Sequence, residues 1–208
     1  MNIPFWTSAG TINLADLQEQ DLTAEILADT LAKLNRFGGR TREPWSVAAH
    51  SVLVERLCPP DLGAWALLHD THEAIVGDIA TPAVDLIALM GNLPQFDDAL
   101  AKAKGQIDLV IARHWSLSVR SLNQTLCRAD RIALIAEAVW FLDAPAERFE
   151  PRDDEDIDRA LCLLSEMLPA SDWRAARELW LSRVEHYAGL GQMTPPATTN
   201  PADTVSGG

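Results

Sequence analysis

Apolar residues recur three and four positions apart along most of the chain, a spacing that places them on one face of a helix. This pattern predicts helices over about 24–34, 46–57, 62–76, 82–90, 96–115, 122–140, 154–168 and 173–190. No stretch alternates apolar and polar residues for long enough to form a half-buried strand. We therefore expect an all-α fold, a single compact multi-helix bundle of about six to eight helices.

Side chains that favour the position just before a helix precede several of these segments. The expected N-caps are Thr23, Asp61, Thr81, Ser121, the acidic run from Asp153, and the Ser171-Asp172 pair. Residues 1–22 lack helical spacing and are expected to wrap the domain as an irregular segment. Pro, Thr, Gly and Ser dominate from Gly191 onward, which predicts a disordered tail over 191–208. The folded domain is therefore expected to span 23–190.

Composition argues against several classes of partner. A 48% share of hydrophobic residues is ample for a core, and 17 Lys and Arg against 30 Asp and Glu give a net charge of −13. Such a surface repels duplex nucleic acid and anionic membranes. The chain has no CxxC pair, no leader-like start, and no apolar run of the ~20 residues that span a bilayer. We therefore expect a cytoplasmic protein that binds neither a nucleic-acid polymer nor a membrane.

Four polar residues interrupt apolar helical faces: His50, His69, Asp70 and Asp130. Alone, His50 and Asp130 are each better explained as hydrogen-bonded core residues, but four such residues would need four separate partners. Two imidazoles and two carboxylates together suit a first-row divalent ion. Glu73 follows Asp70 by three residues, a spacing that places both carboxylates on one face of a helix.

These residues stand in motifs that occur in a fixed order. The motifs are Val47-Ala48-Ala49-His50-Ser51, Leu67-Leu68-His69-Asp70-Thr71-His72-Glu73, Gly77-Asp78-Ile79-Ala80-Thr81-Pro82 and Ala129-Asp130. Their order resembles the H…HD…D signature of the HD-domain metal-dependent phosphohydrolases, over roughly residues 23–142. The GDxxTP element and the upstream Arg36-Phe37 pair resemble, more narrowly, the bacterial 5′-deoxynucleotidase branch. The resemblance implies an HD-domain-like helical bundle.

The resemblance also implies a role for each matching residue. His50, His69, Asp70 and Asp130 match the ligands of one divalent ion, which could be Mn²⁺, Co²⁺, Ni²⁺, Fe²⁺ or Zn²⁺. Glu73 matches a carboxylate that activates or positions the attacking water, and Asp78 matches a candidate general acid or base. The candidates for substrate contact are Arg36, Phe37, Arg40 and Thr81, of which Arg36 matches a phosphate-binding arginine. Phe37 stands where the deoxynucleotidases have Trp, and a capping role is favoured for Thr81.

One ion is favoured over two. The branches that hold two metals use additional histidines between the HD pair and the last aspartate, and only His72 and His114 lie in that interval. We expect His72 to be exposed or to lie beside a ligand, rather than to bind the ion. A two-iron oxygenase is disfavoured for the same reason. Because relatives tend to be dimers, we also expect a homodimer.

The resemblance implies hydrolysis of a nucleotide, namely a (deoxy)nucleoside 5′-monophosphate, by attack of a metal-activated water. A dNTP triphosphohydrolase or an alarmone-type nucleotide hydrolase stays open as an alternative. Such a substrate would need further cations, for which the candidates are Arg36, Arg40, Arg42, Arg128 and Arg131. A non-catalytic nucleotide-sensing or adaptor domain is an alternative of another class. Glu73 and Asp78 argue against it, because a binding module does not require both carboxylates.

Overall fold

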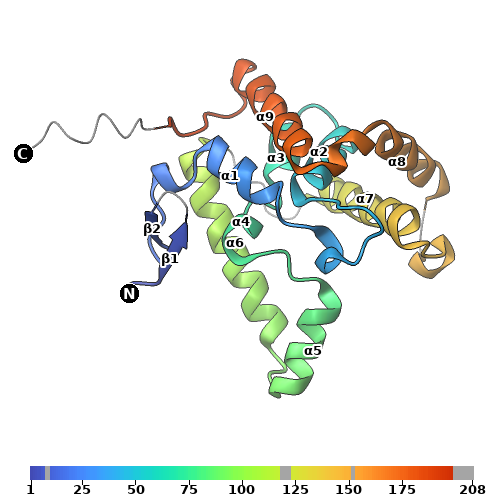
Figure 1. Ribbon diagram of the computed structural model, residues 1–208, viewed down its shortest axis with the longest axis horizontal. Helices are drawn as coiled ribbons and strands as arrows, with labels where there is room; N and C mark the ends of the chain where they lie inside the picture. Colours follow the sequence, from blue (N-terminus) through green and yellow to red (C-terminus); the bar gives the residue numbers. More distant parts are fainter. Residues whose placement is uncertain (8–9, 118–122, 151–152, 199–208) are drawn as a thin grey trace, which may run out of the picture.

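The computed structural model describes residues 1–7, 10–117, 123–150 and 153–198, and it is a bundle of helices with one small hairpin (Figure 1). Its α-helices are α1 Ala24–Leu31, α2 Val47–Leu57, α3 Gly63–Leu68, α4 Glu73–Val76, α5 Thr81–Gly91, α6 Phe96–His114, α7 Gln124–Leu142, α8 Asp154–Glu166 and α9 Trp173–Gly189. Short 3-10 turns are η1 Glu19–Asp21, η2 Arg36–Gly39, η3 Ala146–Phe149 and η4 Leu168–Ser171. The predicted all-α bundle is confirmed.

Helix α2 lies at the centre of the bundle. Every residue from Val47 to Glu55 is buried, and the helix packs against α1, α3, α7, α8 and α9. A helix that is apolar on all sides is stable only when other elements surround it. The side chain of Ser46 caps its first turn by accepting a hydrogen bond from the amide of Ala49. Any polar side chain within α2 must therefore find its partners inside the protein.

The N-terminal segment was predicted to be irregular, but part of it forms a β-hairpin. Strands β1 (Pro4–Thr7) and β2 (Gly10–Asn13) pair antiparallel, with Phe5 opposite Ile12. Most of their side chains are exposed. Because neither face of the hairpin is fully buried, the sequence carries no alternation that would reveal it.

Three of the predicted N-caps are confirmed, because their side chains accept a hydrogen bond from a backbone amide in the first turn of the helix. Thr23, Asp153 and Asp172 each accept such a hydrogen bond at the start of α1, α8 and α9. Helix α7 starts after Asn123, whose side chain caps it, while the predicted cap Ser121 lies outside the residues described here.

Two predicted caps are wrong. Helix α3 follows Leu62, not Asp61, and Thr81 is the first residue of α5 rather than its cap, which is Ala80. Neither helix has a side-chain hydrogen bond at its cap. Proline near the start of α5 removes one of the amides that a cap would satisfy, so this helix depends less on a capping side chain.

Helix α5 and the first turns of α6 extend away from the body as an arm (Figure 1). Leu86, Leu89 and Met90 are exposed on α5. By length and composition alone, the stretch Gly63–Gly91 is apolar enough to cross a membrane, which differs from the expectation that no such run exists. One such stretch is a weak indication, and here it is divided among α3, α4 and α5.

The C-terminal helices close the bundle. Trp180 of α9 is fully buried and packs edge-on against Trp115, the residue that follows α6. The first part of the predicted tail lies on the body, because Met193 is buried and the amide of Thr194 donates to the carbonyl oxygen of Trp115 over 2.9 Å. Residues 199–208 of the predicted tail lie outside the description.

The start of α3 tolerates only glycine. A Cβ added at Gly63 would lie 1.8 Å from the hydroxyl of Tyr187, a buried side chain that donates to Glu55. We expect Gly63→Ala to lower the free energy of unfolding by about 1–3 kcal/mol through overpacking. At Gly105 within α6, a Cβ would meet nothing within 4 Å, so Gly105→Ala should stabilise by up to about 1 kcal/mol. Urea denaturation of both variants checks this, and changes of the same sign would contradict it.

Candidate metal centre

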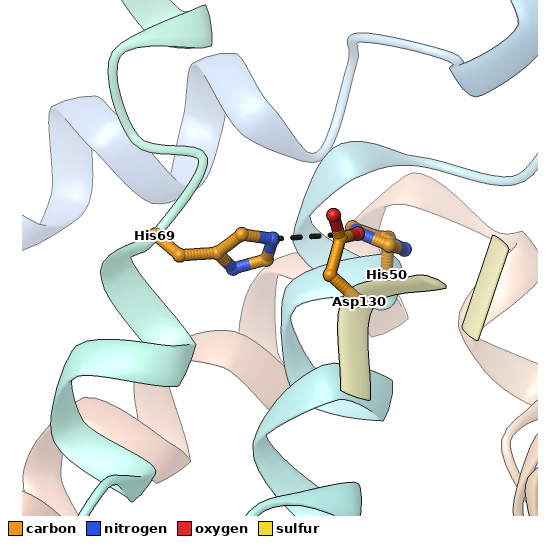
Figure 2. Close-up of side chains that lie close together, drawn as sticks. All are labelled: His50, His69 and Asp130. Atoms are coloured by element: carbon orange, nitrogen blue, oxygen red, sulfur yellow. Dashed lines mark ion pairs between the residues drawn. The ribbon is translucent and has the colours of Figure 1, made fainter. Parts of the chain in front are cut away.

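Three separate elements bring two histidines and an aspartate together. His50 comes from the middle of the buried helix α2, His69 directly follows α3, and Asp130 lies in the second turn of α7. Figure 2 shows the three side chains pointing toward one another. Asp70, next to His69, reaches the same place, since its Oδ2 is near both imidazoles.

Both histidines are held so that Nε2 faces the cluster. His69 Nδ1 lies 2.7 Å from the carbonyl oxygen of Ala66, which can only accept a hydrogen bond, so Nδ1 carries the proton. His50 Nδ1 lies 2.8 Å from Oε1 of Glu137 in the same arrangement. The Nε2 atoms of both are buried and make no hydrogen bond. When neutral, a histidine whose Nδ1 donates to an oxygen presents the Nε2 lone pair that a metal ligand needs.

The four donor atoms are spaced as the ligands of one small ion are. His50 Nε2 lies 3.1 Å from Asp130 Oδ1 and 3.5 Å from Asp70 Oδ2. His69 Nε2 lies 3.2 Å from Asp70 Oδ2 and 3.8 Å from Asp130 Oδ1. Ligand atoms at about 2.0–2.2 Å from an ion such as Zn²⁺ are about 3–3.6 Å from one another. The cluster can therefore hold a metal ion.

A buried carboxylate that the sequence did not single out orients this cluster. Glu137 is fully buried, and it accepts hydrogen bonds from Arg36 Nε (3.0 Å), Trp45 Nε1 (2.8 Å) and His50 Nδ1 (2.8 Å). It lies seven residues after Asp130 on α7, so both carboxylates face α2. Glu137 is the lone charged residue in the apolar second half of α7, and this signal could have marked it as unusual, although it does not reveal its partners.

The chain between α3 and α4 runs as a tight turn. The amide of Thr71 donates to the carbonyl oxygen of Leu68, and the amide of Glu73 donates to that of Asp70. Such bonds to the third residue back place side chains three apart in one column. Asp70 and Glu73 therefore lie on one side, which agrees with the predicted spacing.

Helix α6 packs two polar side chains against this turn. His72 Nδ1 lies 2.9 Å from Oδ1 of Asp108, and Lys104 Nζ lies 3.7 Å from Oε1 of Glu73. Asp108 and Lys104 are four residues apart, on one face of α6. His72 is buried rather than exposed, and it lies beside Asp70, which agrees with the second of the two predicted positions. Ligand atoms of Asp70, His72 and Glu73 lie within 4.8 Å of one another and form a second group that could hold an ion.

The charges in the cluster favour ionised side chains. Burial lowers the pKa of His69, but the carboxylates of Asp70 and Asp130 outweigh burial and raise this pKa well above its usual value. Burial raises the pKa of Asp70 and of Asp130, but contact with His69 and His50 outweighs it and holds both below their usual range. A cation bound here would displace protons from the imidazoles, so its affinity should fall at low pH.

Glu73 differs from the other carboxylates. Burial raises its pKa to about 8, the charges of Asp70 and Asp78 add to this effect, and Lys104 opposes it. Burial also raises the pKa of Asp78, which Arg36 opposes. In the absence of a cation, Glu73 therefore holds a proton at neutral pH.

The residues predicted to contact the substrate differ in how close they lie to the His/Asp cluster. The guanidinium of Arg36 is buried, and its Nη1 lies 3.7 Å from Oδ2 of Asp70, so it borders the cluster. Phe37 is half-buried, has a positive φ of 56°, and lies with its ring 5.7 Å from that guanidinium. Arg40 and Thr81 are exposed, and among the described residues no contact joins either to the cluster.

The raised pKa of Glu73 makes a prediction for the metal-free protein. Between its usual value of 4.5 and about 8, the folded state holds a proton that the unfolded state has lost, so stability falls as the pH rises. Glu73→Gln removes this dependence. With a chelator present, we expect its free energy of unfolding to fall less steeply from pH 5 to 8, by at most about 1.4 kcal/mol per pH unit. Urea denaturation at several pH values measures both slopes, and parallel curves would contradict the assignment.

Comparison with known proteins gives a family but no activity. No protein-family model matches the chain. Over 88 residues it is 31% identical to the uncharacterized protein YfdR of Escherichia coli, and this alignment covers 42% of the present chain and 49% of YfdR. Over 183 residues it is 30% identical to an uncharacterized protein of Rhodobacter capsulatus. That alignment covers 81% of this chain and 88% of the relative. The helical fold and the His/Asp cluster of the present chain are consistent with an HD-like domain. The chain belongs to the same family as the uncharacterized Rhodobacter capsulatus protein.

Proposed function

We propose that this protein is a metal-dependent phosphohydrolase that acts on a (deoxy)nucleoside 5′-monophosphate, with His50, His69, Asp70 and Asp130 as ligands of one divalent ion. The observation that carries the proposal is the pair of buried, unbonded Nε2 atoms of His50 and His69 facing two carboxylates. Buried polar atoms are otherwise nearly always hydrogen-bonded. The class of reaction, hydrolysis of a phosphate ester, is inferred from the order of the HD-like motifs.

The donor set suits a first-row ion of borderline softness. Two imidazoles favour Fe²⁺, Co²⁺, Ni²⁺ or Zn²⁺, and two carboxylates extend the range to Mn²⁺. When bound, such an ion supplies a Lewis acid that lowers the pKa of water and offsets phosphoryl charge. The indole of Trp45 and the guanidinium of Arg36 donate hydrogen bonds to the carboxylate of Glu137 and fix it against His50. These contacts hold His50 in place as a ligand.

Glu73 and Asp78 supply the proton-transfer groups in this proposal. Acid–base catalysis is most effective when the pKa of the group lies near the working pH, and burial brings the pKa of Glu73 to about 8. Glu73 can therefore exchange a proton with the attacking water. Asp78 is half-buried nearby and can serve the leaving oxygen.

Arg36 is the side chain best placed to contact a phosphate. Its Nε is fixed on Glu137, and its Nη1 borders Asp70. An arginine fixed in this way presents its remaining N–H groups in a set direction. In the proposal Phe37 lies against the nucleoside, and Arg40 and Thr81 lie at the outer edge of the substrate site.

The pairing of the other arginines favours a monophosphate over a triphosphate or an alarmone. Arg42 binds Asp143 and the carbonyl oxygen of Trp140, and Arg128 binds Asp153 and Asp156. Arg131 donates to the carbonyl oxygen of Phe149. A longer phosphate chain needs several available cations, and these contacts occupy three of the five candidates.

A substrate and metal screen tests the reaction. Nucleoside mono- and triphosphates are incubated with Mn²⁺, Co²⁺, Ni²⁺ or Mg²⁺, and the products are identified. We expect inorganic phosphate from a deoxynucleoside monophosphate. Asp70→Ala should lose both metal and turnover, whereas Glu73→Gln should keep metal at His50 and His69 but lose turnover by about 100-fold or more. Release of triphosphate or pyrophosphate would contradict the monophosphatase proposal and favour a triphosphohydrolase or an alarmone hydrolase. Absence of turnover with every metal would favour a non-catalytic binding domain.

Glu137 offers a test of how the ligands are held. Glu137→Gln keeps the size of the side chain but removes the charge that fixes His50 and Arg36. We expect metal affinity to fall by about 10–100-fold. Calorimetric titration with Mn²⁺ or Zn²⁺ measures this, with Glu147→Gln on η3 as a surface control. Unchanged affinity would show that Glu137 only supports the fold.

A further inference from the structure

A second group of buried polar atoms lies beside the proposed ligands. His72 and Glu73 are only 6% and 5% exposed, and His72 Nε2 and Glu73 Oε2 make no hydrogen bond. Ligand atoms of these two residues and of Asp70 lie within 4.8 Å of one another. Two buried atoms without partners, on residues whose ligand atoms lie this close to Asp70, indicate that something binds beside them.

The orientation of His72 identifies the kind of ligand. Its Nδ1 lies 2.9 Å from Oδ1 of Asp108, so a proton on Nδ1 is donated to the carboxylate and Nε2 is left with a lone pair. This is the same arrangement that Glu137 gives His50. An imidazole held by a carboxylate through one nitrogen is a common ligand of metal ions through the other.

The charge balance also favours a cation. Asp70, Glu73 and Asp78 bring three carboxyl groups to this region, as their mutual effects on pKa show. Lys104 lies 3.7 Å from Oε1 of Glu73, so it contacts the oxygen that has a partner and leaves Oε2 open. Arg36 Nη1 lies 3.7 Å from Oδ2 of Asp70, so two cations adjoin the three carboxyl groups and balance only part of their charge when all three are ionised.

We propose that Asp70, His72 and Glu73 form a second divalent-cation site, which shares Asp70 with the first. Two carboxylates and one imidazole suit a harder ion than the first cluster does, and Mn²⁺ is the best match. The second site is the weaker of the two, because it has fewer imidazoles and lies against Lys104. It lies beside the proposed hydrolase site but does not require hydrolysis, because counting bound ions reports on it even if no substrate is turned over.

Counting Mn²⁺ in variants of the full chain tests this proposal. Chelator-treated protein is titrated with Mn²⁺, bound ions are measured by equilibrium dialysis, and paramagnetic resonance reports coupling between neighbouring ions. We expect two ions per wild-type chain and a coupled signal. His72→Asn should retain one ion and lose the coupling. His186→Asn, at an exposed histidine on α9, should retain both.

Variants on α6 keep the test sharp if His72→Asn does not fold. Asp108→Asn leaves all three ligands in place but should weaken the second ion by about 10–100-fold without changing the first. Lys104→Met removes the competing ammonium and should tighten the second ion. One ion per wild-type chain at saturating Mn²⁺, or two ions in folded His72→Asn, would overturn the proposal. Absence of turnover in the same preparations would count against the hydrolase alone.

Discussion

A carboxylate buried in an apolar core is stable only when several donors surround it. Glu137 meets this requirement by binding Arg36 from η2, Trp45 just before α2, and His50 within α2. The three donors lie up to 101 residues from it in sequence. These contacts join η2 and α2 to α7. Removal of one partner of a buried ionic group typically costs about 3–5 kcal/mol. The same contacts that fix the position of α7 therefore fix the position of His50 and, about two turns earlier on α7, of Asp130.

The three histidines around the turn after α3 follow one rule. His50, His69 and His72 each bind an oxygen through Nδ1, and each leaves Nε2 buried and unbonded. Such an arrangement at one imidazole could be an accident of packing. At three imidazoles that lie beside several carboxylates, it marks groups that could hold cations. The turn of bonds to the third residue back is what places His69, Asp70, His72 and Glu73 on neighbouring columns.

The sequence predicted the helices and the cluster for different reasons. Helical spacing is a local property, so the existence of α1, α2, α6, α7, α8 and α9 could be inferred from it, and the fold class followed. The proximity of His50 to Asp130 rested on the order of motifs, not on spacing. Long-range partners such as Glu137 and Asp108 could not be assigned, because the sequence does not say which helix faces which. The predicted caps Asp61 and Thr81 failed because capping preference is weak where packing decides the helix start.

The anchors of the histidines differ in one respect that matters for how the centre can change. Asp108 and Glu137 are side chains, so a single substitution can loosen His72 or His50. The anchor of His69 is the carbonyl oxygen of Ala66, which every amino acid at that position would provide. The orientation of His69 is therefore robust to mutation as long as α3 keeps its path. Substitution of Asp108 or Glu137 can therefore change how two of the imidazoles are held, while the backbone alone sets the orientation of the third.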